Sequence, residues 1–109
     1  MKLSVTERIL ALQILPKEGD FVTLNVMRKA QEMLSFTEAE IAKYKFKNIP
    51  TEDGGQRTQW DSSIEQVIDL RLGNKAISII GEALEKLDKE KKLEMNQISL
   101  YEKFVEKQK

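Results

Sequence analysis

The spacing of apolar residues changes twice along this chain, and these changes limit the folds open to it. Up to about residue 43, apolar residues recur three and four positions apart, which is typical of amphipathic helices. Between about residues 44 and 72 they alternate with polar residues and are interrupted by turn residues, as in half-buried strands. Helical spacing returns from about residue 75. This order of segments predicts an α+β fold.

Three helices are predicted in the first part of the chain, where apolar residues have helical spacing. Ser4 and Glu7 have the spacing of a capping box, and so do Thr37 and Glu40, so each pair marks a helix start. Pro16 cannot continue a helix and ends the first one. The predicted helices of this part of the chain are 4–15, 20–34 and 38–43.

A small antiparallel sheet of about three strands is predicted next. Tyr44 and Phe46 fall on one face of its first strand, with lysines between and beside them. The residues from Asp53 to Gly55 form a strong turn signal, which predicts a hairpin. The predicted strands are 44–48, 57–61 and about 66–72.

Two more helices complete the predicted fold, a long one over about 75–93 and a closing one over about 98–106. Both are expected to pack on the body formed by the earlier helices and the sheet. Tyr101, Phe104 and Val105 form a stripe on the closing helix, either as its core face or as a docking ridge. The long helix carries acid-first pairs four residues apart, namely Glu82/Lys86, Glu85/Lys89 and Asp88/Lys92.

The length of 109 residues suits one compact domain, so residues 1–109 are expected to form a single globular domain. No apolar run approaches the roughly 18 residues of a membrane-spanning helix, and no signal peptide is evident. Cysteine is also absent, which fits a reducing cytosol, and no membrane contact is expected.

The side-chain inventory argues against catalysis. Histidine and cysteine are both absent, which removes the usual nucleophile–base arrangements and the usual zinc ligands. No phosphate-binding or dinucleotide-binding motif is present, so no cofactor and no metal are expected. Acidic pairs that could do acid–base chemistry are more readily explained as capping or surface residues. These pairs are Glu38/Glu40, Glu52/Asp53 and Asp61/Glu65.

Charge argues mildly against nucleic acid as a partner. The chain holds 18 basic and 18 acidic residues, spread evenly along its length. Nucleic-acid affinity depends on clustered cations that displace counterions. A local basic patch created by folding is not excluded by this balance.

Four residues are the candidates for contact with a partner. Trp60 is the only tryptophan and lies near Arg57, and both residue types are over-represented at binding hot spots. Tyr44 and Phe46 alternate with lysines, a pattern that suits either single-stranded nucleic acid or an ordinary half-buried strand. The ordinary role for Trp60, as an anchor of the sheet against a helix, is the favoured alternative.

Several short segments are distinctive, namely residues 14–21 (ILPKEGDF), Trp60-Asp61, residues 87–89 (LDK), residues 92–93 (KL) and residues 99–104 (SLYEKF). Through them the chain resembles small uncharacterised proteins of bacteriophages and prophages over most of its length. That resemblance implies a phage or prophage origin and expression in a bacterial cytoplasm, but no activity and no functional residues.

The leading hypothesis is a non-catalytic interaction protein that binds a protein partner, such as a host protein or another phage component. Assembly into a homo-oligomer is a further expectation. The alternative is a nucleic-acid-binding regulator of winged-helix type, in which the helix at 38–43 would enter a groove and residues 49–56 would form the wing. Two acids at the start of that helix speak against it. A small carboxylate-based hydrolase is the third hypothesis.

Overall fold

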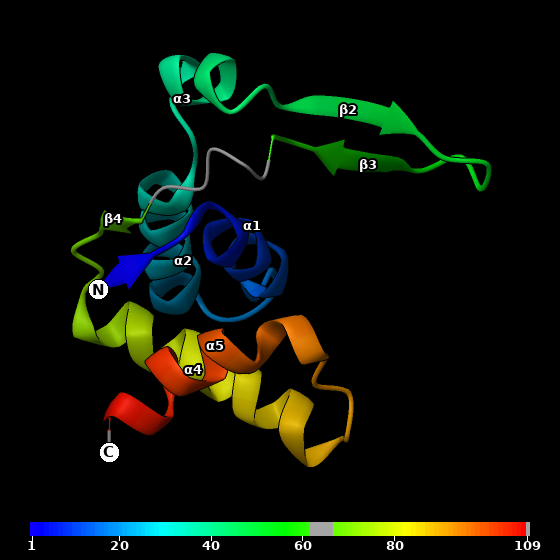
Figure 1. The fold of residues 1–109 in the computed structure, drawn as a ribbon. Helices are drawn as coiled ribbons and strands as arrows, with labels where there is room; N and C mark the ends of the chain where they lie inside the picture. Colours follow the sequence, from blue (N-terminus) through cyan, green and yellow to red (C-terminus); the bar gives the residue numbers. More distant parts are fainter. Residues whose placement is uncertain (62–66, 109) are drawn as a thin grey trace. The chain divides into compact units, whose positions relative to one another are not determined.

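The computed structural model describes residues 1–61 and 67–108. It shows a mixed helix and strand chain that divides into two compact units (Figure 1). We call Met1–Ser35 with Val67–Lys109 the helical unit, and Phe36–Gln66 the hairpin unit. The predicted single domain stays a prediction.

The helical unit contains α1 (Val5–Ile14), α2 (Phe21–Leu34), α4 (Asn74–Lys89) and α5 (Ile98–Phe104). Its short elements are β1 (Lys2–Leu3), β4 (Ile68–Asp69), η2 (Met95–Gln97) and η3 (Glu106–Gln108). The hairpin unit contains α3 (Glu38–Lys43), β2 (Lys47–Pro50) and β3 (Gln56–Gln59).

The predicted helix starts are confirmed. The Ser4 hydroxyl accepts a hydrogen bond from Glu7 N at 3.2 Å, and Ser4 N donates to Glu7 Oε1 at 2.9 Å. Thr37 and Glu40 form the same reciprocal pair at 3.1 and 3.0 Å. These bonds satisfy backbone N–H groups that a helix start leaves without partners. They join residues three apart, which is why sequence spacing alone locates them.

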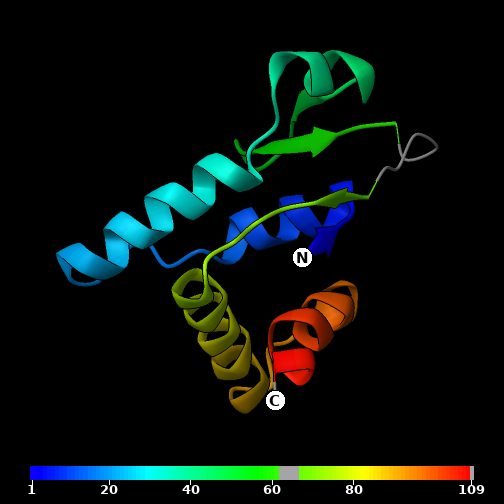
Figure 2. The same ribbon diagram turned by 90° about the vertical axis from the view of Figure 1, so that its left-hand side faces the viewer.

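Apolar faces of α1, α2, α4 and α5 meet in the core of the helical unit, in which α4 and α5 are neighbours (Figure 2). Phe104 and Val105 are buried there and Tyr101 packs against them, so this stripe serves the core. The buried core residues are Leu3, Leu10, Ala11, Leu15, Met27, Ala30, Leu34, Leu72, Ala76, Ile80, Leu84, Leu100, Phe104 and Val105.

A buried arginine joins α1 to the end of α2. Arg8 is only 2% exposed. Its Nε donates to the Leu34 carbonyl oxygen at 3.2 Å and its Nη2 donates to that of Ser35 at 2.8 Å. The last carbonyls of a helix lack backbone partners and carry partial negative charge, which a guanidinium group matches. The sequence pattern did not single out this residue.

A second, partly buried polar contact joins α5 to the start of the chain. Lys103 Nζ donates to Glu7 Oε1 at 2.7 Å and to the Lys2 carbonyl oxygen at 2.8 Å. Burial raises the pKa of the Glu7 carboxyl group, but hydrogen bonds from Lys103, Ser4 and Ser99 outweigh it. The net result is a pKa below the ordinary value, because these contacts favour the charged form.

The described residues contain two separate antiparallel strand pairs, not the predicted sheet of about three strands. β2 pairs with β3, from Lys47 opposite Gln59 to Pro50 opposite Gln56. β4 pairs instead with β1, the two-residue strand at the start of the chain. Of the third predicted strand, residue 66 lies outside the described residues and only Ile68–Asp69 is a strand.

The predicted first strand begins three residues late, because α3 ends in a left-handed turn. Tyr44 caps α3 in a helical conformation and Lys45 has a φ of 56°. The Phe46 N–H then reaches back to the Ile41 carbonyl oxygen at 3.1 Å. This is a Schellman ending, and Lys47 is the first strand residue that follows it. Tyr44 and Phe46 therefore do not share a strand face.

The long helix ends early for the same reason. Lys91 has a φ of 57°, and Lys92 N donates to the Leu87 carbonyl oxygen at 2.8 Å. α4 therefore ends at Lys89 instead of about residue 93. Lys92 has left the helix, so its predicted pairing with Asp88 is lost. Among the described residues, none of the three predicted acid–lysine pairs of this helix forms an ion pair.

Candidate partner-binding surfaces

Four aromatic rings form a cluster in the hairpin unit. The Phe46 ring centroid lies 4.7 Å from that of Phe36, 6.1 Å from that of Tyr44 and 6.3 Å from that of Trp60. Phe36 and Tyr44 meet edge to face at 6.3 Å. The structure thus brings together three of the four predicted partner-contact residues. Phe36, which sequence analysis missed, precedes α3 and has no periodic pattern that would mark it.

Tyr44 lies inside this cluster. It is 1% exposed, and its carbonyl oxygen accepts a hydrogen bond from Asp61 N at 2.8 Å. The Lys43 ammonium lies 6.0 Å from its ring centroid, within the range of a weak cation–π contact. Tyr44 therefore supports the hairpin unit from within, whereas Phe46 and Trp60 are only partly buried.

Trp60 has an unmet hydrogen-bonding capacity. Its Nε1 atom is buried, and no described residue accepts a hydrogen bond from it. A buried indole N–H usually finds a partner, because burying a donor without one costs about 1–3 kcal/mol. Trp60 directly follows β3, so the ring lies at one end of the hairpin.

The turn of the hairpin is built by local polar contacts. Thr51 N donates to the Gly55 carbonyl oxygen at 3.0 Å, and Gly54 has a φ of 86°, which favours glycine. Asp53 Oδ1 accepts from Gly55 N at 3.1 Å and from the Thr51 hydroxyl. The hydroxyl of Thr51 and then the N–H of Gly55 lower the pKa of Asp53. Asp53 is thus a turn residue.

The two edges of the hairpin differ in hydrogen-bonding capacity. The bond that closes the turn makes residues 51 and 55 a hydrogen-bonded pair, so by alternation residues 48, 50, 56 and 58 direct their backbone groups outward. On β2 one of these is Pro50, which has no N–H. The β3 edge offers an N–H and a carbonyl at both Gln56 and Thr58. No strand in the described part of the chain covers either edge.

Arg57, the fourth predicted contact residue, lies in β3 opposite Ile49. Its backbone belongs to the ladder, but its side chain lies outside what the structure describes. Ile49 itself is 37% exposed. The hairpin therefore presents an apolar side chain beside the backbone of Arg57, a few residues from Trp60.

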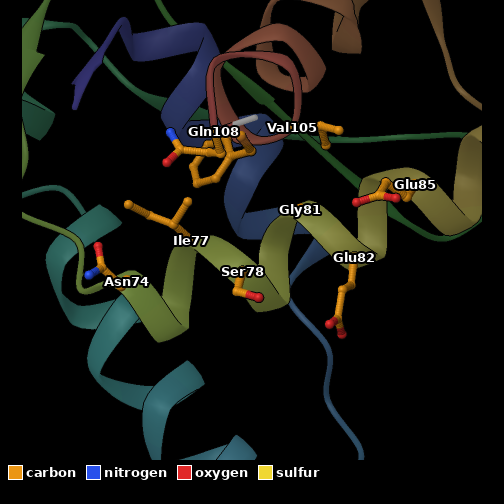
Figure 3. Close-up of a pocket in the computed structure, with 9 residues that line it drawn as sticks. Asn74, Ile77, Ser78, Gly81, Glu82, Glu85, Val105 and Gln108 are labelled. Atoms are coloured by element: carbon orange, nitrogen blue, oxygen red, sulfur yellow. The ribbon is translucent and has the colours of Figure 1, made fainter.

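A pocket of about 360 Å³ lies in the helical unit, where α4 passes close to the end of α5 (Figure 3). Gly81 makes this approach possible, because a Cβ atom there would lie 2.9 Å from the Phe104 carbonyl oxygen. Ile77, Phe104 and Val105 supply the apolar part of the lining.

The remaining lining is polar and acidic. Figure 3 shows Glu85 on the side of α4 nearer Val105, and Gln108 opposite Ile77 at the other end. Glu82 also lines the pocket, and no described cation forms an ion pair with it or with Glu85. This leaves carboxylate charge at the pocket that the described residues do not pair.

Burial and then carboxylates raise the pKa of Tyr101, a residue of α5 that does not line this pocket. Burial of the Tyr101 hydroxyl raises its pKa first, and the carboxylates of Asp88, Glu106 and Glu85 raise it further. A negative environment disfavours the phenolate form. Acidic side chains from both α4 and η3 therefore act on Tyr101.

Two of the acidic residues considered for catalysis have structural roles. Glu40 belongs to the capping box of α3, and Asp53 belongs to the hairpin turn. Glu65 lies outside the described residues. Within the described ranges, no group of acidic residues is arranged to hold a metal ion.

Comparisons with protein-family models, with curated proteins and with solved structures found no match to this chain. The resemblance to bacteriophage and prophage proteins, and the cytoplasmic location, therefore stay predictions. Among the described residues, no helix has the length and apolar character needed to cross a membrane.

Proposed function

We propose that this protein is a non-catalytic interaction protein that binds a protein partner through its hairpin unit. The partner supplies an extended segment that pairs with the outer edge of β3. The observation that carries this proposal is the β3 edge, which no described strand covers and which has backbone donors and acceptors at Gln56 and Thr58. Next to it lies Trp60, whose indole N–H has no acceptor among the described residues. A phage or prophage role belongs to the same proposal.

Addition of a strand to an exposed sheet edge is a common mode of peptide recognition. Backbone hydrogen bonds supply affinity, and neighbouring side chains supply specificity. Here Ile49 and the partly buried Trp60 are the apolar groups near the strand pair. The Trp60 N–H, from which no described residue accepts a hydrogen bond, is buried, so an acceptor on the partner reaches it when the indole ring turns outward on binding. The β2 edge is less suited to pairing with a partner strand, because Pro50 has no N–H to donate.

The winged-helix alternative receives less support. The short helix α3 carries Glu38 and Glu40 in its first turn, where they would face phosphate groups unfavourably. The tip of the hairpin, in the position of a wing, carries Glu52 and Asp53. The test below therefore includes a result that would indicate a nucleic-acid partner.

The test is affinity capture from a bacterial lysate, with and without nuclease, using the purified wild type and three variants as baits. Thr58→Pro removes an outward N–H from the β3 edge without breaking a bond of the hairpin. Trp60→Phe keeps an aromatic ring but removes the indole N–H. Met95→Gln is the control, because Met95 is 85% exposed and lies in the helical unit. Circular dichroism checks that each bait is folded.

We expect the wild type and Met95→Gln to retain the same protein after nuclease treatment. Thr58→Pro and Trp60→Phe should each lose most of it, because loss of a central contact of about 2 kcal/mol lowers affinity about thirtyfold. Capture that nuclease abolishes would favour the nucleic-acid alternative. Equal recovery by all four baits, or no recovery by the wild type, would contradict the proposal.

A further inference from the structure

We propose that the pocket between α4 and the end of α5 is a second binding surface, which takes an arginine side chain from an exposed segment of a protein partner. This surface lies in the helical unit and does not depend on the hairpin edge. Its occupant is identified by two features of the lining, an apolar part and a carboxylate that no cation in the described ranges pairs.

The apolar part of the pocket suits the stem of a long basic side chain. Ile77 and Val105 line it together with the buried Phe104 ring. The aliphatic stem of arginine or lysine packs on apolar surface while its charged head stays in a polar environment. A volume of about 360 Å³ accommodates one such side chain and part of its backbone. A fully apolar ligand would bury the acidic lining unfavourably.

The charge of the lining selects a cation. Glu85 lines the pocket, and no described cation pairs with it or with the neighbouring Glu82. A cation that binds here therefore meets carboxylates that form no ion pair with a described residue.

Polar groups in the pocket favour arginine over lysine. The side chains of Asn74, Ser78 and Gln108 also line it and offer hydrogen-bond acceptors. A guanidinium group has five donors in a planar array and is more weakly hydrated than an ammonium group. It can therefore place two N–H groups side by side on the Glu85 carboxylate, which an ammonium group does with less directional fit.

The test uses the peptide acetyl-Gly-Arg-Gly-amide, titrated into the ¹⁵N-labelled full-length protein and followed by amide chemical shifts. The same peptide with citrulline in place of arginine is the neutral control, because it keeps the shape but removes the charge. Glu85→Gln removes the pocket carboxylate. Glu90→Gln is the matched variant, since Glu90 caps α4 outside the residues that line this pocket.

We expect saturable shifts at the amides of Ser78, Gly81 and Val105, with a dissociation constant on the order of 1 mM for so small a probe. Glu85→Gln should weaken binding about three- to tenfold, whereas Glu90→Gln should leave it unchanged. Equal shifts with the citrulline peptide would overturn the proposal. So would shifts spread over the whole acidic surface, or equal affinity of Glu85→Gln and Glu90→Gln for the arginine peptide. Because Thr58 and Trp60 are untouched, these outcomes are separate from those of the hairpin test.

Discussion

Replacing Gly81 with alanine tests the close packing of α4 against α5. In an exposed helix interior this change raises the free energy of unfolding by about 1 kcal/mol, because alanine is the better helix former. At Gly81 the added Cβ atom would lie 2.9 Å from the Phe104 carbonyl oxygen and 3.8 Å from Val105 Cγ2. The nearer contact is with backbone, so a side-chain rotation cannot relieve it.

The expected effect of Gly81→Ala is a net loss of stability. The end of α5 must move to admit the methyl group, and Phe104 and Val105 are only 2% and 3% exposed, so that motion disturbs the core. Overpacking of this kind costs about 1–3 kcal/mol. Because the clash involves backbone, we take the upper part of that range. After the helix-propensity gain, the free energy of unfolding should fall by about 1–2 kcal/mol.

Urea unfolding followed by far-ultraviolet circular dichroism measures this change, and a melting temperature lower by about 5–10 °C should accompany it. Ser78→Ala is the control, because Ser78 is exposed on α4 one turn earlier and alanine there should be stabilising by about 0.5 kcal/mol. If Gly81→Ala is as stable as the wild type or more stable, while Ser78→Ala behaves as expected, the close approach of the two helices is refuted.

Three further changes probe the helix end and the two polar contacts. Lys91→Gly should raise the free energy of unfolding by about 0.5–1 kcal/mol in urea titrations, because φ is positive there, whereas Lys92→Gly should not. Arg8→Met should lower it by about 2 kcal/mol, because the end of α2 loses two hydrogen bonds, and an unchanged denaturation midpoint would contradict this. Glu7→Gln should lower it by about 2 kcal/mol at pH 7, because Lys103 loses its ion pair. Since the folded pKa of Glu7 lies below its ordinary value of 4.5, the contribution of this pair is complete above about pH 5.5 and is lost as pH falls through the folded pKa, so the deficit of Glu7→Gln should shrink in acid. A deficit that does not change with pH would contradict that assignment.

Much of the candidate surface in the hairpin unit could be found from sequence. Aromatic residues in a chain with few of them stand out, and Tyr44, Phe46 and Trp60 do meet in one cluster. Phe36 could not be found, because a single phenylalanine before a helix carries no periodic signal. Whether each ring is buried also could not be found, since burial depends on which other segments arrive beside it.

The pocket at Gly81 had no sequence signal at all. A glycine inside a helical pattern is compatible with a kink, a functional site or close packing. Only the position of Phe104, more than twenty residues along the chain, shows that close packing is the reason. The sequence likewise carried no signal that Glu85 forms no ion pair with a described residue. Its spacing from Lys89 predicts an ion pair, yet the side chains do not come within bonding distance.

The sequence by itself determined the helix starts, because the contacts that form a capping box join residues three positions apart. It also determined the mixed helix and strand character and the hairpin turn, which likewise depend on neighbours along the chain. The tertiary structure decided the rest. It placed β4 beside β1, ended two helices at lysines with positive φ, and divided the chain into two units. Those features depend on contacts between distant segments, or on a backbone conformation that lysine rarely adopts, and local spacing does not record either.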